Sequence, residues 1–307
     1  MFKYLKHLLN FTFKQILKFL HLKNKEKSLE YFCQISTKLK SSQLKQSTIE
    51  NKKYLHKTLF SILKNTKITE FNKEKAYYLL TKLKQKSLKQ STIKQILSYA
   101  NEGLNLAIDF GIITKNPLKN LNKFLKNKSK IKINKTIKQS HIKKLLNKAT
   151  GELKIFLYFA FYTGARASEI LAITNKDINY KKNYISINKN ATRYGLTSPK
   201  NGNFRNIPLA DILKQELEKI NFKKFNVDYF TIYYQFKKLK KSLNLKIGSL
   251  HSIRHTYASN CLHLKIDLPI IAKNLGHNDI TMLSRVYSHE IFSIKENKKL
   301  RNLFYFK

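Results

Sequence analysis

Cysteine, glycine and tryptophan are all scarce in this sequence. Among 307 residues there are two cysteines, eight glycines and no tryptophan. Cys33 and Cys261 are too few and too far apart to predict a disulfide framework or a zinc site, and they fit a reducing, cytoplasmic setting. The chain favours Lys, Asn, Ile, Phe and Tyr throughout, which indicates a base-composition bias acting on the whole sequence.

A long uninterrupted apolar run is missing from the start of the chain. The first 25 residues are apolar and basic, but Lys3, Lys6, Lys14 and Lys18 divide them into short pieces. We therefore expect neither a signal peptide nor a membrane-spanning helix there. The apolar residues recur at helical spacing, which predicts an extra helix that docks on the rest of the protein or on a partner. A helix lying on a membrane surface is the alternative.

Acidic residues are few. The chain has 18 Asp and Glu against 61 Lys and Arg, which gives a formal charge of +43 and a pI near 10.1. Such an excess predicts a polyanionic partner, in particular nucleic acid, with an attraction that weakens as salt rises. The composition bias accounts for part of this charge. It does not explain why lysines outnumber the acidic residues by such a large margin.

Arginine is much scarcer than lysine. The six arginines all lie in the second half of the chain: Arg166, Arg193, Arg205, Arg254, Arg285 and Arg301. Lysine cannot replace arginine where a planar guanidinium must hold a phosphate through two parallel hydrogen bonds. A chain that uses lysine nearly everywhere has therefore kept arginine at a few informative places.

The hydrophobic content predicts two folded domains. Hydrophobic residues make up 42% of the chain and aromatic residues 12%, which is enough for packed cores. Four segments of the first part have helical apolar periodicity: 28–40, 48–64, 73–85 and 91–110. Residues 1–125 are thus predicted to form an all-helical domain, in which Ser47 and Glu50 have the spacing of a capping box at a helix start. The basic, polar stretch 126–138 is predicted to be a linker.

Residues 139–307 are predicted to form a second, mostly helical domain. The dense apolar run 153–162 is long enough for a buried helix. Short strands at Tyr184–Ile187 and Asn206–Leu209 flank a turn at Pro199–Gly202, and the helical period returns afterwards. The expected fold class is therefore mainly α, with a small antiparallel β-sheet in the second domain.

Two segments near the middle of the chain carry polar residues suited to catalysis. Gly164 interrupts the buried helix just before Arg166, and Glu169 follows three residues later. A buried arginine clamped by a glutamate for structural reasons explains this pattern equally well. Lys200 lies on the predicted turn, where a lysine is usually only solvated.

Two further segments follow. His251 and Arg254 are three residues apart and project from one helix face. A charged imidazole repels a guanidinium, so this shared face makes best sense around an anion. Leu275-Gly276-His277 is followed ten residues later by Tyr287. A single tyrosine is normally a packing residue, so each segment alone is weak evidence.

Together these segments supply what metal-free transesterification of a phosphodiester needs. A tyrosine oxygen can attack phosphorus, and a covalent phosphotyrosine keeps the energy of the broken bond. Two arginines neutralise charge on the non-bridging oxygens, while a lysine and a histidine assist proton transfer. Two-metal catalysis would need clustered carboxylates, and the acidic residues are scattered. No metal or nucleotide cofactor is implied. The candidate catalytic residues are Arg166, Lys200, His251, Arg254, His277 and Tyr287.

In order and spacing, these residues resemble the catalytic domain of the tyrosine recombinase (phage integrase) family. The resemblance covers residues 140–290, and the run from His251 to Tyr287 is most similar to the Xer branch. It implies that Arg166 and Arg254 bind the scissile phosphate and that Tyr287 forms a 3′-phosphotyrosine.

The resemblance also implies roles for the remaining candidates. Lys200 would be the acid for the 5′-hydroxyl, and His251 and His277 would complete the pocket. Glu169 would support Arg166 without acting as a catalyst.

The layout of the chain resembles the same family. Residues 1–125 are similar in position to its helical core-binding (SAM-like) domain, and 139–307 to its catalytic domain. The tail 291–307 is expected to dock on a neighbouring protomer, with packing on its own domain as the alternative. The implied partners are a duplex DNA site and a homotetramer on two sites, with a dimer on each. A DNA translocase is a candidate activator, and no membrane is implied.

The function implied is site-specific DNA recombination, of the kind that resolves chromosome dimers. An integrase of a mobile element would use the same chemistry. A topoisomerase would relax supercoils with the same pocket, but the short core-binding half and the closeness to the Xer branch argue against it. A non-catalytic DNA-binding relative is a further alternative, and the complete set of six candidate residues argues against that.

Overall fold

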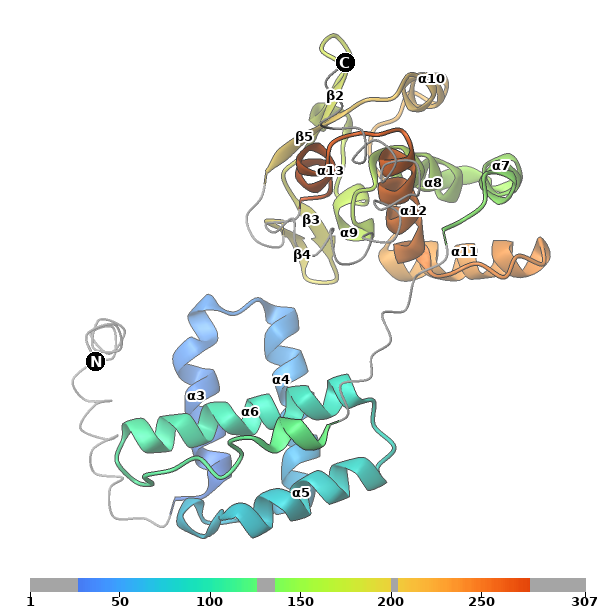
Figure 1. The fold of residues 1–307 in the computed structure, drawn as a ribbon. Coiled ribbons are helices and arrows are strands. Elements are labelled where there is room, and N and C mark those ends of the chain that lie inside the picture. The colour runs from blue at the N-terminus through green and yellow to red at the C-terminus, as the bar shows by residue number, and fades with distance from the viewer. Residues whose placement is uncertain (1–26, 126–135, 200–203, 277–307) are drawn as a thin grey trace, which may run out of the picture. The chain divides into compact units, whose positions relative to one another are not determined.

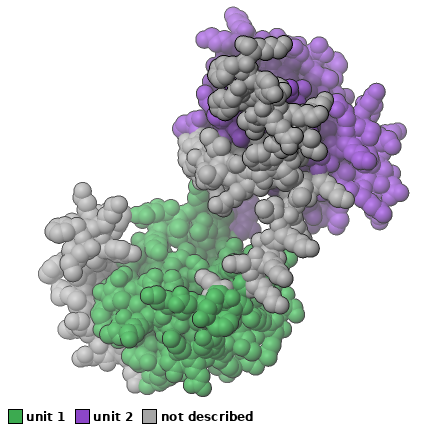
Figure 2. Space-filling view, viewed as in Figure 1, with its two compact units in different colours: residues 1–128 green, residues 129–307 purple. Residues whose placement is uncertain are grey.

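The computed structural model describes residues 27–125, 136–199 and 204–276. The chain divides into two compact units, residues 1–128 and 129–307, and each is described by itself (Figure 1; Figure 2). The expected helix over 1–25, the C-terminal tail and much of the expected linker lie outside the described residues. Within the described parts, no helix is both long and apolar enough to cross a membrane.

The described part of unit 1 is mostly helical. Its α-helices are α3 (Leu29–Lys40), α4 (Gln46–Leu63), α5 (Lys73–Gln85) and α6 (Gln90–Asp109). Short 3-10 turns lie at Ser41–Gln43, Ile68–Glu70 and Leu121–Phe124. Helix α3 starts where the Ser28 hydroxyl accepts a hydrogen bond from the Tyr31 N–H, and Asn72 caps α5 in the same way.

The core of unit 1 is built around α6, which contacts α3, α4 and α5. Its buried residues recur at helical spacing from Ile93 to Ala107. At Gly103 a Cβ would lie 2.5 Å from Cys33 Sγ and 2.9 Å from the Cys33 backbone nitrogen. The absence of a side chain at Gly103 therefore lets α3 and α6 approach each other closely.

Unit 2 is also mostly helical in its described residues. Its α-helices are α7 (Gln139–Lys148), α8 (Gly151–Thr163), α9 (Ala167–Ile170), α10 (Asp211–Lys219), α11 (Tyr229–Ser242), α12 (Leu250–His263) and α13 (Leu268–Leu275). A 3-10 turn lies at Asn175–Asp177. Helix α8 is apolar on nearly all sides and is surrounded by α7, α10, α11 and α12, so it forms the centre of the core.

Two small antiparallel sheets complete unit 2. Strands β1 (Ile178–Asn179), β2 (Tyr184–Ile187) and β5 (Arg205–Pro208) form one sheet in the order β1-β2-β5. Strands β3 (Asn190–Thr192) and β4 (Gly195–Thr197) form a separate hairpin. In the first sheet Ile185 pairs with Ile207, and Ile187 with Arg205. The register places Arg205 at the end of the sheet that leads to the segment containing Lys200.

The fold class predicted from the sequence is confirmed. Helices α3 to α6 lie on the four predicted periodic segments, and β2 and β5 lie on the two predicted strands. The predicted capping box is wrong, because α4 begins at Gln46 with Lys45 as its N-cap. Ser47 is already inside the first turn, and the Thr48 N–H donates to the Lys45 carbonyl at 2.8 Å.

Candidate active site

The end of α8 places the first candidate arginine. Gly164 adopts a left-handed conformation, with φ of 62°, and ends the helix. The Thr163 hydroxyl donates to the Phe159 carbonyl and accepts from the Ala165 N–H, which fixes the turn. A Cβ at Gly164 would lie 2.3 Å from the Tyr257 ring. This turn is therefore both tightly packed and specific to glycine, and it brings Arg166 to the start of α9.

Helix α12 carries the second candidate arginine, which is 6% exposed. Arg254 Nη1 donates to the Gly164 carbonyl at 2.9 Å, and Nη2 donates to the Leu275 carbonyl at 2.5 Å. One guanidinium thus joins the turn after α8 to the end of α13. Its planar shape suits two acceptors that lie on different segments of the chain.

The C-terminal end of α13 gathers three arginines. The carbonyl oxygens of Asn274, Leu275 and Gly276 accept hydrogen bonds from Arg205, Arg254 and Arg166, at 2.7, 2.5 and 3.3 Å. These carbonyls lie at the negative end of the helix dipole, where cations are favoured. Gly276 caps the helix with φ of 65°. The three consecutive carbonyls therefore hold the side chains of Arg166 at the N-cap of α9, Arg254 on α12 and Arg205 on β5 in one cluster, and α13 contacts both α12 and β5 (Figure 1).

Glu169 is the carboxylate of this cluster, and its side chain is fully buried. Its Oε1 accepts from Arg166 Nη1 at 2.9 Å and from Arg205 Nη1 at 3.2 Å. Its Oε2 accepts from Arg205 Nη2 at 2.7 Å and from the Arg166 backbone N–H at 2.8 Å. Burial acts to raise the pKa of Glu169, but Arg205 and Arg166 outweigh it and hold that pKa below its ordinary value.

His251 lies on α12 one turn before Arg254. Loss of solvent around the ring, followed by the positive charges of Arg254 and Arg166, lowers the pKa of His251. The ring also meets His255 edge to face, with centroids 4.9 Å apart. Partial burial and the charges of both arginines therefore favour the neutral form of the His251 ring.

Among the described residues of this cluster, positive groups outnumber negative ones. The Glu169 carboxylate faces two guanidinium groups, those of Arg166 and Arg205. Arg254 adds a third positive charge. The Arg166 side chain is 25% exposed, and its Nη1 and Nη2 each carry a second hydrogen. Partly buried guanidinium groups of this kind suit an anion with several oxygen acceptors, such as a phosphodiester.

The structure therefore brings together Arg166, His251 and Arg254 among the six predicted site residues. Lys200, His277 and Tyr287 lie outside the described residues. The segment that leads to Lys200 is held at Ser198, whose carbonyl accepts from Asn190 Nδ2 at 2.9 Å. Within the described residues, no cluster of three or more His, Cys, Asp or Glu side chains is arranged to hold a metal ion.

Arg205 is the member of the cluster to which the sequence pattern gave no role. The one available signal was its rarity, because it is one of six arginines in a lysine-rich chain. Its contacts join β5 to α9 and α13, which are far apart in the sequence, so no local pattern predicts them.

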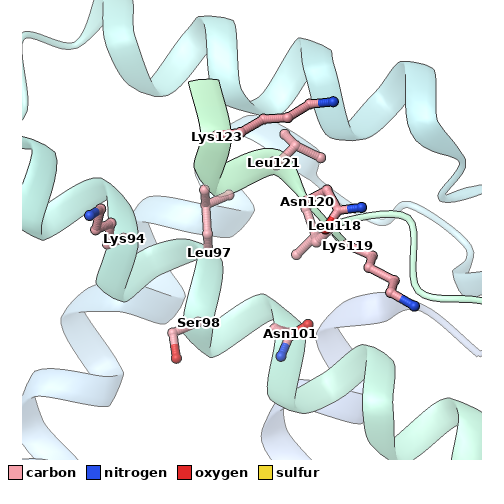
Figure 3. A pocket seen from close by; sticks show the side chains of 9 residues that line it. All are labelled: Lys94, Leu97, Ser98, Asn101, Leu118, Lys119, Asn120, Leu121 and Lys123. Atoms are coloured by element: carbon pink, nitrogen blue, oxygen red, sulfur yellow. The ribbon is translucent and has the colours of Figure 1, made fainter. Parts of the chain in front are cut away.

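Unit 1 contains a basic hollow of about 440 Å³ between α6 and the segment around Leu118–Lys123. Lys94, Lys119 and Lys123 lie around it, together with Asn101 and Ser98 (Figure 3). Leu97, Leu118 and Leu121 also line the hollow, and its ammonium, amide and hydroxyl groups suit the phosphate and sugar groups of a nucleic acid.

Comparison with known proteins identifies the family. Residues 124–293, more than half of the chain, match the sequence profile of the phage integrase family. The chain belongs to the phage integrase family. Its arginine cluster and all six candidate residues lie within the part that matches.

Two relatives show how this phage integrase family member compares in sequence. It is 31% identical to tyrosine recombinase XerA of Saccharolobus solfataricus over 175 residues, which cover 54% of this chain and 56% of the relative. It is 24% identical to a XerC-like tyrosine recombinase of Caldanaerobacter subterraneus over 258 residues, which cover 69% of this chain and 66% of the relative. The chain thus spans less than two thirds of the length of each.

Solved structures of two integrases share the fold of this phage integrase family member. The Tn1549 transposon integrase in complex with a circular intermediate DNA matches with a TM-score of 0.74 and 19% identity, over 89% of this chain and 99% of that one. A lambda integrase tetramer bound to a Holliday junction matches with a TM-score of 0.67 and 18% identity, over 88% of this chain and 80% of that one. At these identities the likeness establishes the fold.

Proposed function

We propose that this protein cleaves and rejoins duplex DNA through a covalent bond between Tyr287 and a backbone phosphate. The observation that carries the proposal is the pair Arg166 and Arg254, held on adjacent carbonyls of α13 with His251 beside them. In a member of the phage integrase family, this positive cluster is the candidate site for the scissile phosphate.

The chemistry proceeds by displacement at phosphorus. The Tyr287 oxygen attacks the phosphorus, the bond from phosphorus to the 5′ oxygen breaks, and a 3′-phosphotyrosine forms. Arg166 and Arg254 hold the non-bridging oxygens and offset their growing negative charge. Lys200 donates a proton to the departing 5′ oxygen. The phosphotyrosine keeps the energy of the broken bond, so the reverse attack by a 5′-hydroxyl reseals the strand without a nucleotide.

His251 and His277 complete the proposed pocket. A neutral imidazole accepts a proton, so the lowered pKa of His251 supports a role in removing the proton of the Tyr287 hydroxyl. His277 follows directly after Gly276, whose carbonyl accepts from Arg166. This position in the sequence supports a place for His277 beside the same phosphate.

We propose duplex DNA as the substrate and unit 1 as the core-binding domain. The basic hollow near Lys94 and Lys119 supports contact with the DNA backbone. The structural neighbours described with a circular intermediate DNA and as a tetramer on a Holliday junction support a homotetramer on two sites, with a dimer on each. A translocase activator and a docking role for the C-terminal tail stay predictions.

The biological role we propose is Xer-like resolution of chromosome dimers, which the sequence similarity to XerA supports. Integration of a mobile element is the second candidate, and the fold likeness to the transposon integrase is the observation that favours it. Mapping covalent adducts across the source genome separates the two roles. One site near the replication terminus supports chromosome resolution, whereas sites at the ends of a mobile element support integration.

The chemistry is tested with a DNA site found in that way and nicked next to the scissile phosphate. The nick lets the 5′-hydroxyl fragment diffuse away, so a covalent protein–DNA adduct accumulates and survives denaturation. We expect the adduct with the unaltered protein and none with Tyr287→Phe, which should bind the same DNA with unchanged affinity. Binding without any adduct from the unaltered protein would instead support a non-catalytic DNA-binding relative.

A further inference from the structure

Arg205, the first residue of β5, is a buried cation at the edge of the candidate site. Its side chain is 3% exposed. All three nitrogens of its guanidinium donate to protein oxygens: Nε to the Asn274 carbonyl, and Nη1 and Nη2 to the two carboxylate oxygens of Glu169. Because Nε, Nη1 and Nη2 all donate to buried protein oxygens, we assign Arg205 a place behind the phosphate site and not a direct contact with a DNA phosphate.

The contact with Glu169 leads directly to Arg166. Glu169 Oε1 accepts from both arginines, and its Oε2 accepts from Arg205 and from the Arg166 backbone N–H. The bidentate fork of Arg205 fixes the plane of the carboxylate. Since that carboxylate holds Arg166 at both its main chain and its side chain, the orientation of the Arg166 guanidinium depends on Arg205.

Arg205 also bonds to the end of α13, next to the carbonyls that hold Arg254 and Arg166. Arg205 Nε donates to the Asn274 carbonyl at 2.7 Å, one residue before the carbonyl that holds Arg254. The left-handed Gly276 lies against the guanidinium, because a Cβ there would be 2.8 Å from Arg205 Nη1. One side chain thus fixes the end of α13 relative to β5 and to Glu169.

We propose that Arg205 is a positioning residue for strand cleavage, which sets the orientation of Arg166 through Glu169 and anchors the end of α13. This inference rests on the proposed function. A lysine would keep one positive charge beside Glu169, but it cannot bond both carboxylate oxygens and the Asn274 carbonyl in one plane. The charge of this residue alone is therefore not sufficient for its role.

The first experiment is the substitution Arg205→Lys, with Arg193→Lys as the matched control. Arg193 lies between β3 and β4, where its guanidinium stacks on the Tyr194 ring at 4.8 Å. The measured quantities are the single-turnover rate of adduct formation at saturating nicked DNA and, separately, the affinity for DNA in the Tyr287→Phe background. We expect Arg205→Lys to lower the rate roughly 100-fold, as misplacement of a catalytic group does, with unchanged affinity. Arg193→Lys should leave both unchanged. An unchanged rate for Arg205→Lys would overturn the proposal.

The second experiment is a double-mutant cycle, which separates positioning from general stability. If Arg205 acts through Arg166, then adding Arg205→Lys to Arg166→Ala should cause little further loss of rate. Losses that multiply in the double variant would show that Arg205 acts by another route and would overturn the proposal. Circular dichroism establishes that each variant is folded.

Should Arg205→Lys fail to fold, the same cycle is run with Glu169→Gln, which keeps the shape of the linking side chain and removes its charge. We expect the effects of Glu169→Gln and Arg166→Ala not to multiply, and multiplication would again overturn the proposal. Failure of the proposed function itself is distinguishable, because then the unaltered protein forms no adduct.

Discussion

Arg166 and Arg254 donate to adjacent carbonyl oxygens, those of Gly276 and Leu275, at the end of one short helix. Arg166 is the N-cap of α9 and Arg254 lies on α12, and the main chain at the end of α13 holds both. The separation of two guanidinium groups is therefore set by the backbone spacing of neighbouring residues. A fixed spacing of this kind suits the two non-bridging oxygens of one phosphate.

Replacing Arg254 by lysine should reduce cleavage far more than binding. Arg254→Lys loses the two-pronged contact with the Gly164 and Leu275 carbonyls. We expect adduct formation to slow by about 10² to 10³, the usual loss when one group that stabilises the transition state is removed. The rate is measured on nicked DNA at saturation, with Arg193→Lys as the control. A rate within the range of that control would contradict a phosphate-binding role.

Alanine at Gly276 should disturb both stability and cleavage. Gly276 has φ of 65°, and a Cβ there would press on the Arg205 guanidinium. Gly151 is the matched control in the same unit, because it has φ of 56° and a Cβ there meets nothing within 4 Å.

We expect Gly151→Ala to cost only the left-handed strain, about 1–2 kcal/mol of unfolding free energy. Gly276→Ala should cost more and should also lower the rate of adduct formation. Thermal unfolding and the cleavage assay are the measurements. Equal behaviour of the two variants would show that the contact with Arg205 is unimportant.

The lowered pKa of His251 predicts how the stability of the folded protein depends on pH. Its ring has a folded-state pKa below the ordinary 6.5, so between these two values the unfolded chain binds more protons than the folded one. The contribution of His251 to stability is therefore complete above pH 6.5 and is lost as the pH falls through its folded pKa.

NMR titration of the ring protons, assigned with His251→Gln, measures this pKa directly. Adding DNA should raise it, because a phosphate anion beside the ring favours the charged imidazolium. A free-protein pKa at or above 6.5 would be inconsistent with a ring held in the field of Arg254 and Arg166.

Alanine at Gly103 should destabilise unit 1, although alanine normally favours a helix over glycine. The added methyl group would overlap Cys33 Sγ and the Cys33 backbone, so α3 and α6 would have to separate. We expect a loss of about 1–3 kcal/mol, typical of overpacking. Hydrogen exchange in α3 and α6 of the full chain reports it, with Ser98→Ala, an exposed position on α6, as the control. Unchanged exchange in Gly103→Ala would contradict the close approach of the two helices.

The sequence predicts most of the helices because their apolar residues recur at a regular period. It predicts β2 and β5 because two short isoleucine-containing segments flank a turn with Pro199 and Gly202. It does not predict the β3–β4 hairpin, whose strands are three residues long and carry largely polar or exposed side chains. Spacing along α12 places His251 and Arg254 on one face. The buried ion pair between Arg205 and Glu169 is invisible to such patterns, because it joins residues from distant segments through tertiary packing.

The carbonyl oxygens of Asn274, Leu275 and Gly276 couple the positions of the three arginines. Because one helix terminus seats the guanidinium groups of three separate elements, a small rotation of α13 would displace all of them at once. One of these arginines cannot follow such a rotation while the other two keep their positions. The position of this helix end therefore affects all three guanidinium groups together.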